Sequence, residues 1–346
     1  MKNQKKINRR NWLQLGIGAI IGTISLKILG CKESSSKKET IVENCVPTQY
    51  DTMGPFHPNK DQSDKDFDLT SFNGAAEKPK GELIYVRGKV TDVNCNPISG
   101  ALVMIWHANT HGKYTHEYDT NKVEDDPNFQ GWGQMKTNEE GEYGFKTIKP
   151  GKYAISEGGD DWRTPHIHFK VAKRGFHELI TQMYFEEEKE LNEKDAFASG
   201  LSDIEKSQVI RKRQKSINGI ETEASLINFD ITLKNVLKEE KDKKIFADYI
   251  GDYELNLSHS ELKEELNIFY GGKRNEITLT ISQENGVLYA EMPIQPKCEI
   301  FPKSKDRYIY RAFEADIEFK RNEEKHVTGL IFHRHYDFPE ITAKKN

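Results

Sequence analysis

From residue 82 onward, apolar and polar residues alternate with a period of two, the spacing of strands that bury one face. The runs 83–90 and 101–108 are separated by a segment with Asn-Pro and Ser-Gly pairs, which predicts two neighbouring strands and a turn. Further short strands, each bounded by Gly, Pro, Asn or Asp, are predicted at 142–148, 152–156, 166–172 and 179–185. Short strands at this spacing predict a mainly β chain whose first domain is a β-sandwich.

The following segment, 186–217, is charged and helix-prone, with an interruption at 199–203. It predicts a helical excursion on the surface of the sandwich, with Ser202 or Asp203 as the N-cap. The run 228–233 then predicts one returning strand.

A charge-rich seam at 236–244 separates this part from a second β-like region. Alternation at 276–281 and 316–321, with turn signals between, predicts a small C-terminal β-barrel-like domain. The predicted domains are therefore 45–237 and 246–346.

The N-terminus has the pattern of an export signal. A basic start without acidic residues is followed by an apolar run that ends at Ile28-Leu29-Gly30-Cys31, which resembles the lipobox of bacterial lipoproteins. Residues 1–31 are interpreted as a signal peptide with Cys31 as the lipidated residue. A plain transmembrane anchor is the alternative, and Lys27 inside the apolar run argues against it. Arg9-Arg10 is also similar to a twin-arginine export signal.

The polar, Ser-rich segment 32–44 is interpreted as a tether. The resulting localisation is the cell envelope, lipid-anchored, on the periplasmic side or at the outer membrane or cell surface. The formal charge is −4, and loss of the six basic residues in 1–30 leaves about −10, so nucleic acid is not expected as a partner.

Three cysteines remain after Cys31. In an exported protein an oxidised pair is expected, and Cys45 with Cys95 is the natural candidate because both flank the start of the first domain. Cys298 would then be a buried thiol. Three free thiols is the alternative, because sequence alone does not fix connectivity.

His166 and His168 stand one residue apart in a predicted strand, so both imidazoles project from one face. The spacing alone does not identify a metal site, because a His-x-His pair in a β protein is more often a solvated or hydrogen-bonded face. His333 and His335 repeat the spacing in the C-terminal region, and we interpret that second pair as surface.

The first pair belongs to a series of five sequence blocks that follow one another in order, at 106–114, 129–137, 141–153, 161–170 and 179–185. With Gly54-Pro55-Phe56 upstream and Asp230-Ile231 downstream, this set resembles the intradiol ring-cleavage dioxygenases, most closely the protocatechuate 3,4-dioxygenase type. The resemblance implies a ferric ion, Fe(3+), held by Tyr114, Tyr153, His166 and His168.

The chemistry of these residues agrees with that ion. Phenolate oxygens are hard, anionic donors that favour Fe(III), and neutral imidazoles complete the coordination. By resemblance, Tyr153 is the axial ligand that leaves when substrate binds, and it acts briefly as a base, with His168 opposite. Arg163 would stabilise negative charge developing on the substrate ring, and Gln182 would support the ligands.

The resemblance implies cleavage of a catechol-type aromatic diol with O2 to a cis,cis-muconate-type diacid. Relatives often assemble from paired chains, so a homo-oligomer is a candidate assembly. Two departures, Gln134 where relatives usually have Arg and Tyr153-Ala154-Ile155 where Tyr-Pro-Trp is frequent, alter the pocket wall and argue against protocatechuate itself.

The C-terminal region, about 246–343, resembles the lipocalin-like β domain often appended to β-lactamase-type serine hydrolases. No nucleophile and base pair stands out in it, so it is interpreted as a packing or binding module. Two other hypotheses remain for the whole chain: a non-catalytic lipoprotein that binds aromatics or metal, and, less favoured, a zinc or copper hydrolase, for which tyrosinate is a rare ligand.

Overall fold

The structure is a computed structural model, and it describes residues 45–75, 77–154, 162–215, 220–236, 246–256, 277–284, 286–293, 295–310, 315–334 and 340–346. The predicted signal peptide with Cys31, the predicted tether and most of the predicted seam lie outside these ranges. Within them, no helix has the length and apolar character needed to cross a membrane.

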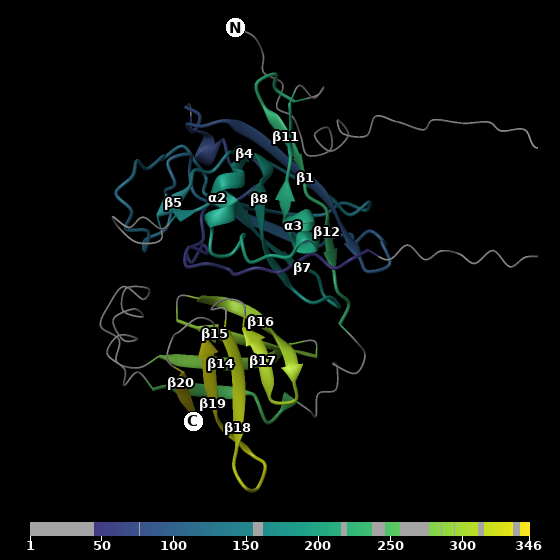
Figure 1. Ribbon diagram of the computed structural model, residues 1–346, viewed down its shortest axis with the longest axis vertical. Helices are drawn as coiled ribbons and strands as arrows, with labels where there is room; N and C mark the ends of the chain where they lie inside the picture. Colours follow the sequence, from purple (N-terminus) through teal and green to yellow (C-terminus); the bar gives the residue numbers. More distant parts are fainter. Residues whose placement is uncertain are drawn as a thin grey trace, which may run out of the picture.

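The N-terminal part of the fold is a sandwich of two five-stranded sheets (Figure 1). One sheet has the order β10-β11-β1-β12, with β4 also paired to β1, and the other has the order β3-β2-β7-β8-β9. The strands are β1 Leu83–Asp92, β2 Leu102–Trp106, β3 Trp132–Lys136, β4 Glu142–Ile148, β7 His166–Ala172, β8 Leu179–Phe185, β9 Ile210–Arg211, β10 Arg213–Lys215, β11 Ser225–Asn228 and β12 Ile231–Leu233. A separate two-stranded sheet joins β5 Tyr153–Ala154 to β6 Trp162–Arg163.

The helical excursion is shorter than predicted. It comprises η2 Glu186–Glu188, α2 Lys189–Lys194 and α3 Asp203–Val209, and η1 Phe72–Gly74 lies earlier in the chain. Ser202 is the N-cap of α3 and forms a capping box with Glu205. The prediction that the helix-prone run extends to residue 217 is wrong, because the chain becomes strands β9 and β10 at the ends of the two sheets, where Arg and Lys side chains suit an edge.

The predicted single strand at 228–233 is two strands. Both β11 and β12 run parallel to β1, but they pair with its two halves. The break falls where the Phe229 carbonyl packs against Gly88, at a distance that leaves no room for a Cβ atom. The close approach of two backbones therefore interrupts the ladder.

The sandwich core and the candidate site lie on opposite faces of one sheet. Ile167, Phe169 and Val171 of β7 are fully buried between the two sheets, with Ile105 of β2 in the same cluster. Because side chains alternate along a strand, His166 and His168 must project from the outer face of this sheet. Something has to cover that face for both to be buried.

The C-terminal part is a closed barrel of eight antiparallel strands, which confirms the predicted barrel-like form (Figure 1). Its order is β13 Gly251–Leu255, β14 Thr278–Glu284, β15 Val287–Met292, β16 Gln295–Ser304, β17 Arg307–Tyr310, β18 Ala315–Arg321, β19 Val327–Arg334 and β20 Ile341–Lys345. Aromatic side chains, including Tyr253, Tyr310 and Phe332, are buried within it.

Strand β16 joins the barrel to the sandwich. Its Glu299 is buried and accepts hydrogen bonds from the His177 ring and from the backbone N–H of Glu178 (2.6 Å). Lys170 on β7 donates to the carbonyl of Lys297 (3.3 Å). A cavity lies between the sandwich and the barrel and is lined by Phe246, Leu288 and Tyr308 among others. None of its lining residues belongs to the candidate site.

We call residues 45–57 the N-terminal strap. Its later residues contact side chains on the outer face of the sheet: Asp51 contacts Tyr184, Gly54 contacts His168 and His57 contacts Trp106. A disulfide between Cys45 and Cys95 fastens the start of the strap to the sandwich, as predicted, and Cys298 is buried and lies outside that disulfide. Met53 in the strap is fully buried, and its sulfur lies 3.8 Å from Cys298 Sγ of the barrel. The strap and the barrel thus meet beside the histidines of β7.

Candidate active site

The two histidines of β7 lie close together and are buried. Each is only 2% exposed, and their Nε2 atoms are 3.1 Å apart. The His166 Nδ1–H donates to the Thr164 carbonyl (2.7 Å), so its Nε2 lone pair faces His168. Burial, with the nearby Arg163 charge as a second cause, lowers the pKa of His166 to about 3. The His166 imidazole is consequently neutral near pH 7, the form in which histidine binds a metal.

The ring of His168 is fixed by its neighbours. Trp106, its register partner on β2, stacks on it with a centroid distance of 4.7 Å and an interplanar angle of 3°. Gly54 of the strap also lies against this ring, and a Cβ added to it would be 3.2 Å from His168 Cε1. Burial and then His166 lower the pKa of His168. The strap and β2 together hold this imidazole in one orientation.

Tyr114 approaches the histidines from a loop and Tyr153 approaches them from strand β5. The Tyr114 Oη lies 3.4 Å from His166 Nε2, and the two tyrosine rings are 5.4 Å apart. Gly112 makes this approach possible: its φ is +82°, and the Lys152 carbonyl occupies the position that a Cβ would take. The Tyr114 N–H donates to Asp119 Oδ2 (2.7 Å), which fixes the loop.

Burial raises the pKa of both tyrosines, and for Tyr153 the nearby Arg163 charge opposes the rise. Without a compensating cation both side chains are therefore phenols. A highly charged metal ion is what would convert buried phenols to ligating phenolates. This donor set, two neutral imidazole nitrogens and two potential phenolates, fits Fe(III). Among the described residues, no group of three or more His, Cys, Asp or Glu side chains could hold a metal ion.

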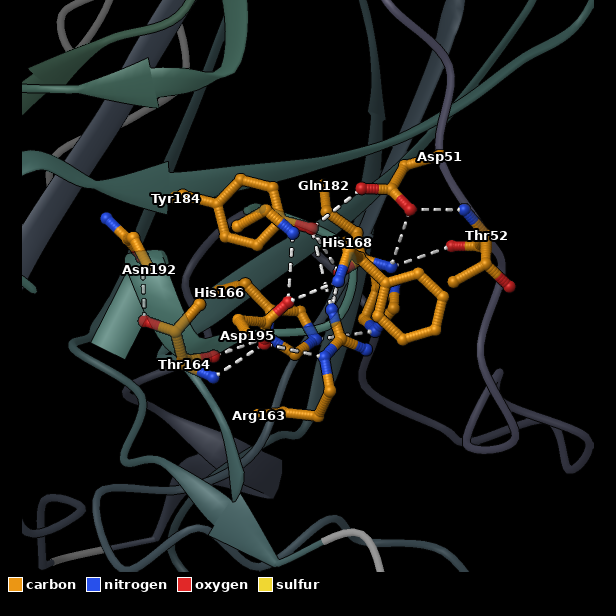
Figure 2. A network of polar contacts seen from close by, with 12 residues as sticks. Asp51, Thr52, Arg163, Thr164, His166, His168, Gln182, Tyr184, Asn192 and Asp195 are labelled. Carbon is orange, nitrogen blue, oxygen red and sulfur yellow. Dashed lines mark hydrogen bonds and ion pairs between the residues drawn. The ribbon is translucent and has the colours of Figure 1, made fainter. Parts of the chain in front are cut away.

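Arg163 is 2% exposed and lies among acidic and amide partners (Figure 2). Its Nε donates to Asp195 Oδ2 (2.8 Å) and its Nη2 donates to Gln182 Oε1 (2.6 Å). The guanidinium also lies over the Phe197 ring at 4.1 Å. Because β6 pairs Arg163 with Tyr153 of β5, the charge is held beside one of the candidate ligands.

All six side chains predicted for the site are thus in one region of the sandwich. Three further residues, Asp51, Tyr184 and Asp195, form the surrounding polar network in Figure 2 and were not predicted from the sequence. Asp195 is in the charged run that we expected to be helical, and Asp51 is three residues before the Gly54-Pro55-Phe56 block. The position of Asp51 next to that block was the only signal available.

The second His-x-His pair differs from its interpretation as plain surface. His333 is held between Glu318 Oε2 (2.7 Å) and Glu340 Oε1 (2.8 Å), with 20% of its side chain exposed. His335 lies outside the described residues. The spacing is the same as in β7, but the partners of His333 are carboxylates in an ion-pair arrangement.

Comparison with known proteins identifies the family. The family model described as "Dioxygenase" matches residues 53–235, more than half of the chain. The chain is 40% identical over 136 residues to the protocatechuate 3,4-dioxygenase beta chain of Burkholderia cepacia, covering 39% of this chain and 58% of that relative. It is 35% identical over 117 residues to a catechol 1,2-dioxygenase of Candida albicans, covering 31% and 37%. The chain belongs to the intradiol ring-cleavage dioxygenase family.

Among solved structures, a 3-chlorocatechol 1,2-dioxygenase from Rhodococcus opacus is similar with a TM-score of 0.44 and 22% identity, covering 55% of this chain and 73% of that one. The chain spans 58% and 37% of the two curated relatives, and the matched family region ends before the barrel.

Proposed function

We propose that the protein is a non-haem Fe(III) intradiol dioxygenase that cleaves a catechol-type aromatic diol with O2 to a cis,cis-muconate-type diacid. The observation that carries the proposal is the convergence of Tyr114, Tyr153, His166 and His168 on one buried point, inside a region that matches the family. These four residues would hold the ion. When bound, Fe(III) would supply a Lewis acid that makes the diol hydroxyls more acidic and its ring reactive to O2.

The protein's own residues would then perform three tasks. His166 and His168 stay neutral because burial keeps their pKa low, so they add no positive charge to the centre. Tyr153, the tyrosine that lies next to Arg163 in the β5–β6 sheet, would accept a proton from the incoming diol. Arg163, always charged, would stabilise negative charge that develops on the substrate ring.

The aromatic side chains next to the candidate ligands favour a flat, aromatic molecule as the substrate. Phe56 of the strap lies with its ring 4.7 Å from Tyr114 and 5.8 Å from Tyr153, next to the candidate ligands. The substituents on the diol are set by the pocket wall. Since Gln134 is at a position where relatives usually have Arg, a simple catechol suits this site better than an acidic ring such as protocatechuate.

The metal and colour of the purified protein test the proposal. Protein that lacks residues 1–31, reconstituted with Fe(III), should contain about one iron per chain and show a burgundy charge-transfer band, which anaerobic catechol should shift. Admission of O2 should then yield a muconate-type product. Colourless, iron-loaded protein would overturn the tyrosinate assignment. Coloured protein that binds catechol but never consumes O2 would favour the alternative, a non-catalytic binding lipoprotein.

The Tyr153→Phe variant separates the roles of the two tyrosines. If Tyr153 is the ligand that leaves, the variant should retain iron through the other three residues but bind catechol more slowly in anaerobic stopped-flow mixing. Tyr114→Phe is the matched comparison, and it should weaken iron retention more. Equal effects of the two substitutions on both readouts would contradict distinct roles.

We further propose that the protein is exported and lipid-anchored through Cys31. The basic start, the apolar run and the lipobox-like ending support this, and so does the Cys45–Cys95 disulfide, which is typical of oxidising compartments. Metabolic labelling with a fatty-acid analogue should mark the wild-type chain and not Cys31→Ala. Labelling of both, or of neither, would contradict lipidation at this residue.

A further inference from the structure

We propose that Asp51 is a positioning residue for Arg163, which it reaches through Gln182 and Tyr184. The inference rests on the proposed function, because it gives Asp51 a part in the reaction that Arg163 would support. Asp51 belongs to the N-terminal strap and not to the sheet that carries the candidate ligands.

The strap follows β8 closely at this point. The Asp51 N–H donates to the Ile180 carbonyl (2.9 Å), and the Thr181 hydroxyl donates to the Gln49 carbonyl (2.7 Å). These contacts place the Asp51 carboxylate against the polar side chains of β8. Tyr184 Oη donates to Asp51 Oδ2 (2.7 Å), and Gln182 Nε2 is 3.4 Å from Asp51 Oδ1 (Figure 2).

The direction of these hydrogen bonds is what Asp51 controls. Burial raises the pKa of Asp51, but the Arg163 charge and the Tyr184 hydrogen bond oppose the rise and favour the carboxylate form. A carboxylate can only accept, so both Gln182 and Tyr184 turn their donor hydrogens toward Asp51. The Gln182 Nε2 also donates to the Thr52 carbonyl (3.0 Å), which excludes the flipped amide. The acceptor Oε1 of Gln182 and the lone pairs of the Tyr184 oxygen are thereby left facing Arg163.

Arg163 needs this arrangement of acceptors because it is buried and permanently charged. Its Nη2 lies 2.6 Å from Gln182 Oε1 and 3.5 Å from Tyr184 Oη. Asp195 holds the Nε at the other end and is itself fixed by the Thr164 N–H (2.9 Å). Two carboxylates, one in direct contact and one acting through intermediates, therefore fix the guanidinium and leave Nη1 outside these contacts.

A structural role for Asp51, as an anchor of the strap alone, makes different predictions. If Asp51 only anchors the strap, removing any hydrogen bond between the strap and β8 should have the same effect, which is to loosen the strap. Loss of the relay would alter Arg163 specifically, because Asn at position 51 can donate as well as accept. The Tyr184 hydroxyl could then turn toward Gln182 Oε1, at 3.1 Å, and compete with Arg163 for that oxygen.

The test compares Asp51→Asn with Thr181→Val, which removes a strap hydrogen bond from the same strand without touching Arg163. In Asp51→Asn, kcat for catechol cleavage should fall by about 10- to 100-fold, with KM, iron content and the charge-transfer band near wild-type values. Thr181→Val should lower the unfolding midpoint and leave kcat unchanged. If Asp51→Asn does not fold, Tyr184→Phe removes the branch of the relay that passes through the hydroxyl and should lower kcat by a smaller factor, again with iron content near the wild-type value.

A second readout does not depend on turnover. In the ¹⁵N–¹H spectrum of iron-free protein, the Arg163 guanidinium signals should shift and exchange faster in Asp51→Asn but not in Thr181→Val. Wild-type kcat in Asp51→Asn, or an equal fall of kcat in Thr181→Val, would overturn the positioning role. If wild-type protein cleaves no catechol, the proposed function fails, and unchanged guanidinium signals in Asp51→Asn would separately overturn the inference.

Discussion

Strands β7 and β19 carry the same His-x-His spacing in different surroundings. On β7, the partners of His166 and His168 are two tyrosines, a stacked tryptophan and each other, and both rings are almost fully buried. On β19, His333 is held between two glutamates with one fifth of its side chain exposed. The spacing only directs two side chains to one face. The elements that cover that face decide whether they form a metal site.

The largest difference between the strands should appear on removal of one histidine from each. His168→Ala should lose nearly all bound iron and the visible band, because three donors remain where four converge. His333→Ala should keep both. Iron per chain and the absorption spectrum, measured after identical reconstitution, check the prediction. Comparable iron loss in the two variants would contradict the assignment of the site to β7.

The next largest difference should be between two ion pairs, one near each histidine pair: Arg163 with Asp195, and His333 with Glu318. Asp195→Ala would leave the buried Arg163 with an unpaired Nε and should cost about 3–5 kcal/mol in the free energy of unfolding. Glu318→Ala removes a partly exposed partner of His333 and should cost less than about 1 kcal/mol. Urea unfolding of both variants provides the measurement, and similar midpoints would show that burial does not separate these ion pairs.

A smaller effect is expected from Gly54→Ala, which changes the N-terminal strap where it contacts His168 of β7. The residue has a φ of +69°, and a Cβ there would press on the His168 ring. The substitution should cost about 1–2 kcal/mol and shift the charge-transfer band without loss of iron. Gly175→Ala is the matched control: its φ is +94°, but a Cβ there meets nothing within 4 Å. An unshifted band in Gly54→Ala would show that the strap does not constrain His168.

The smallest effect should come from a residue just before the last strand of the barrel. Glu340→Ala, which removes the second partner of His333, should change the unfolding free energy by less than about 0.5 kcal/mol and should not affect catechol turnover. Thermal unfolding and steady-state rates test this. A fall in kcat would show that β19 is coupled to the site on β7 and would contradict the view that the two histidine pairs are independent.

The sequence was sufficient where local pattern controls structure. Alternation predicted β7 and β8, and the ordered blocks predicted that Tyr114, Tyr153 and Arg163 come together with the histidines. It was insufficient where distant contacts control structure. The break between β11 and β12 depends on Gly88 of another strand, and local pattern does not encode that approach.

The polar network was missed for the same reason. Asp51 contacts Tyr184 across 133 positions of the chain, and neither residue is conspicuous in its own segment. Asp195 is one acid among many in a charged run, and only the fold shows that it faces Arg163. His333 was interpreted as plain surface because its glutamate partners come from a neighbouring strand and from a residue just before β20.

The strap has a consequence for the order in which the site is assembled. It is made before the rest of the fold, yet it contacts β8 and, through Met53, a barrel residue 245 positions later in the chain. Contacts this distant form late because a long loop must close first. The ligand-bearing strands can therefore fold while their outer face is still open. We expect a period during biogenesis in which an iron ion enters freely, followed by closure of the strap and barrel, after which exchange of the metal is slow.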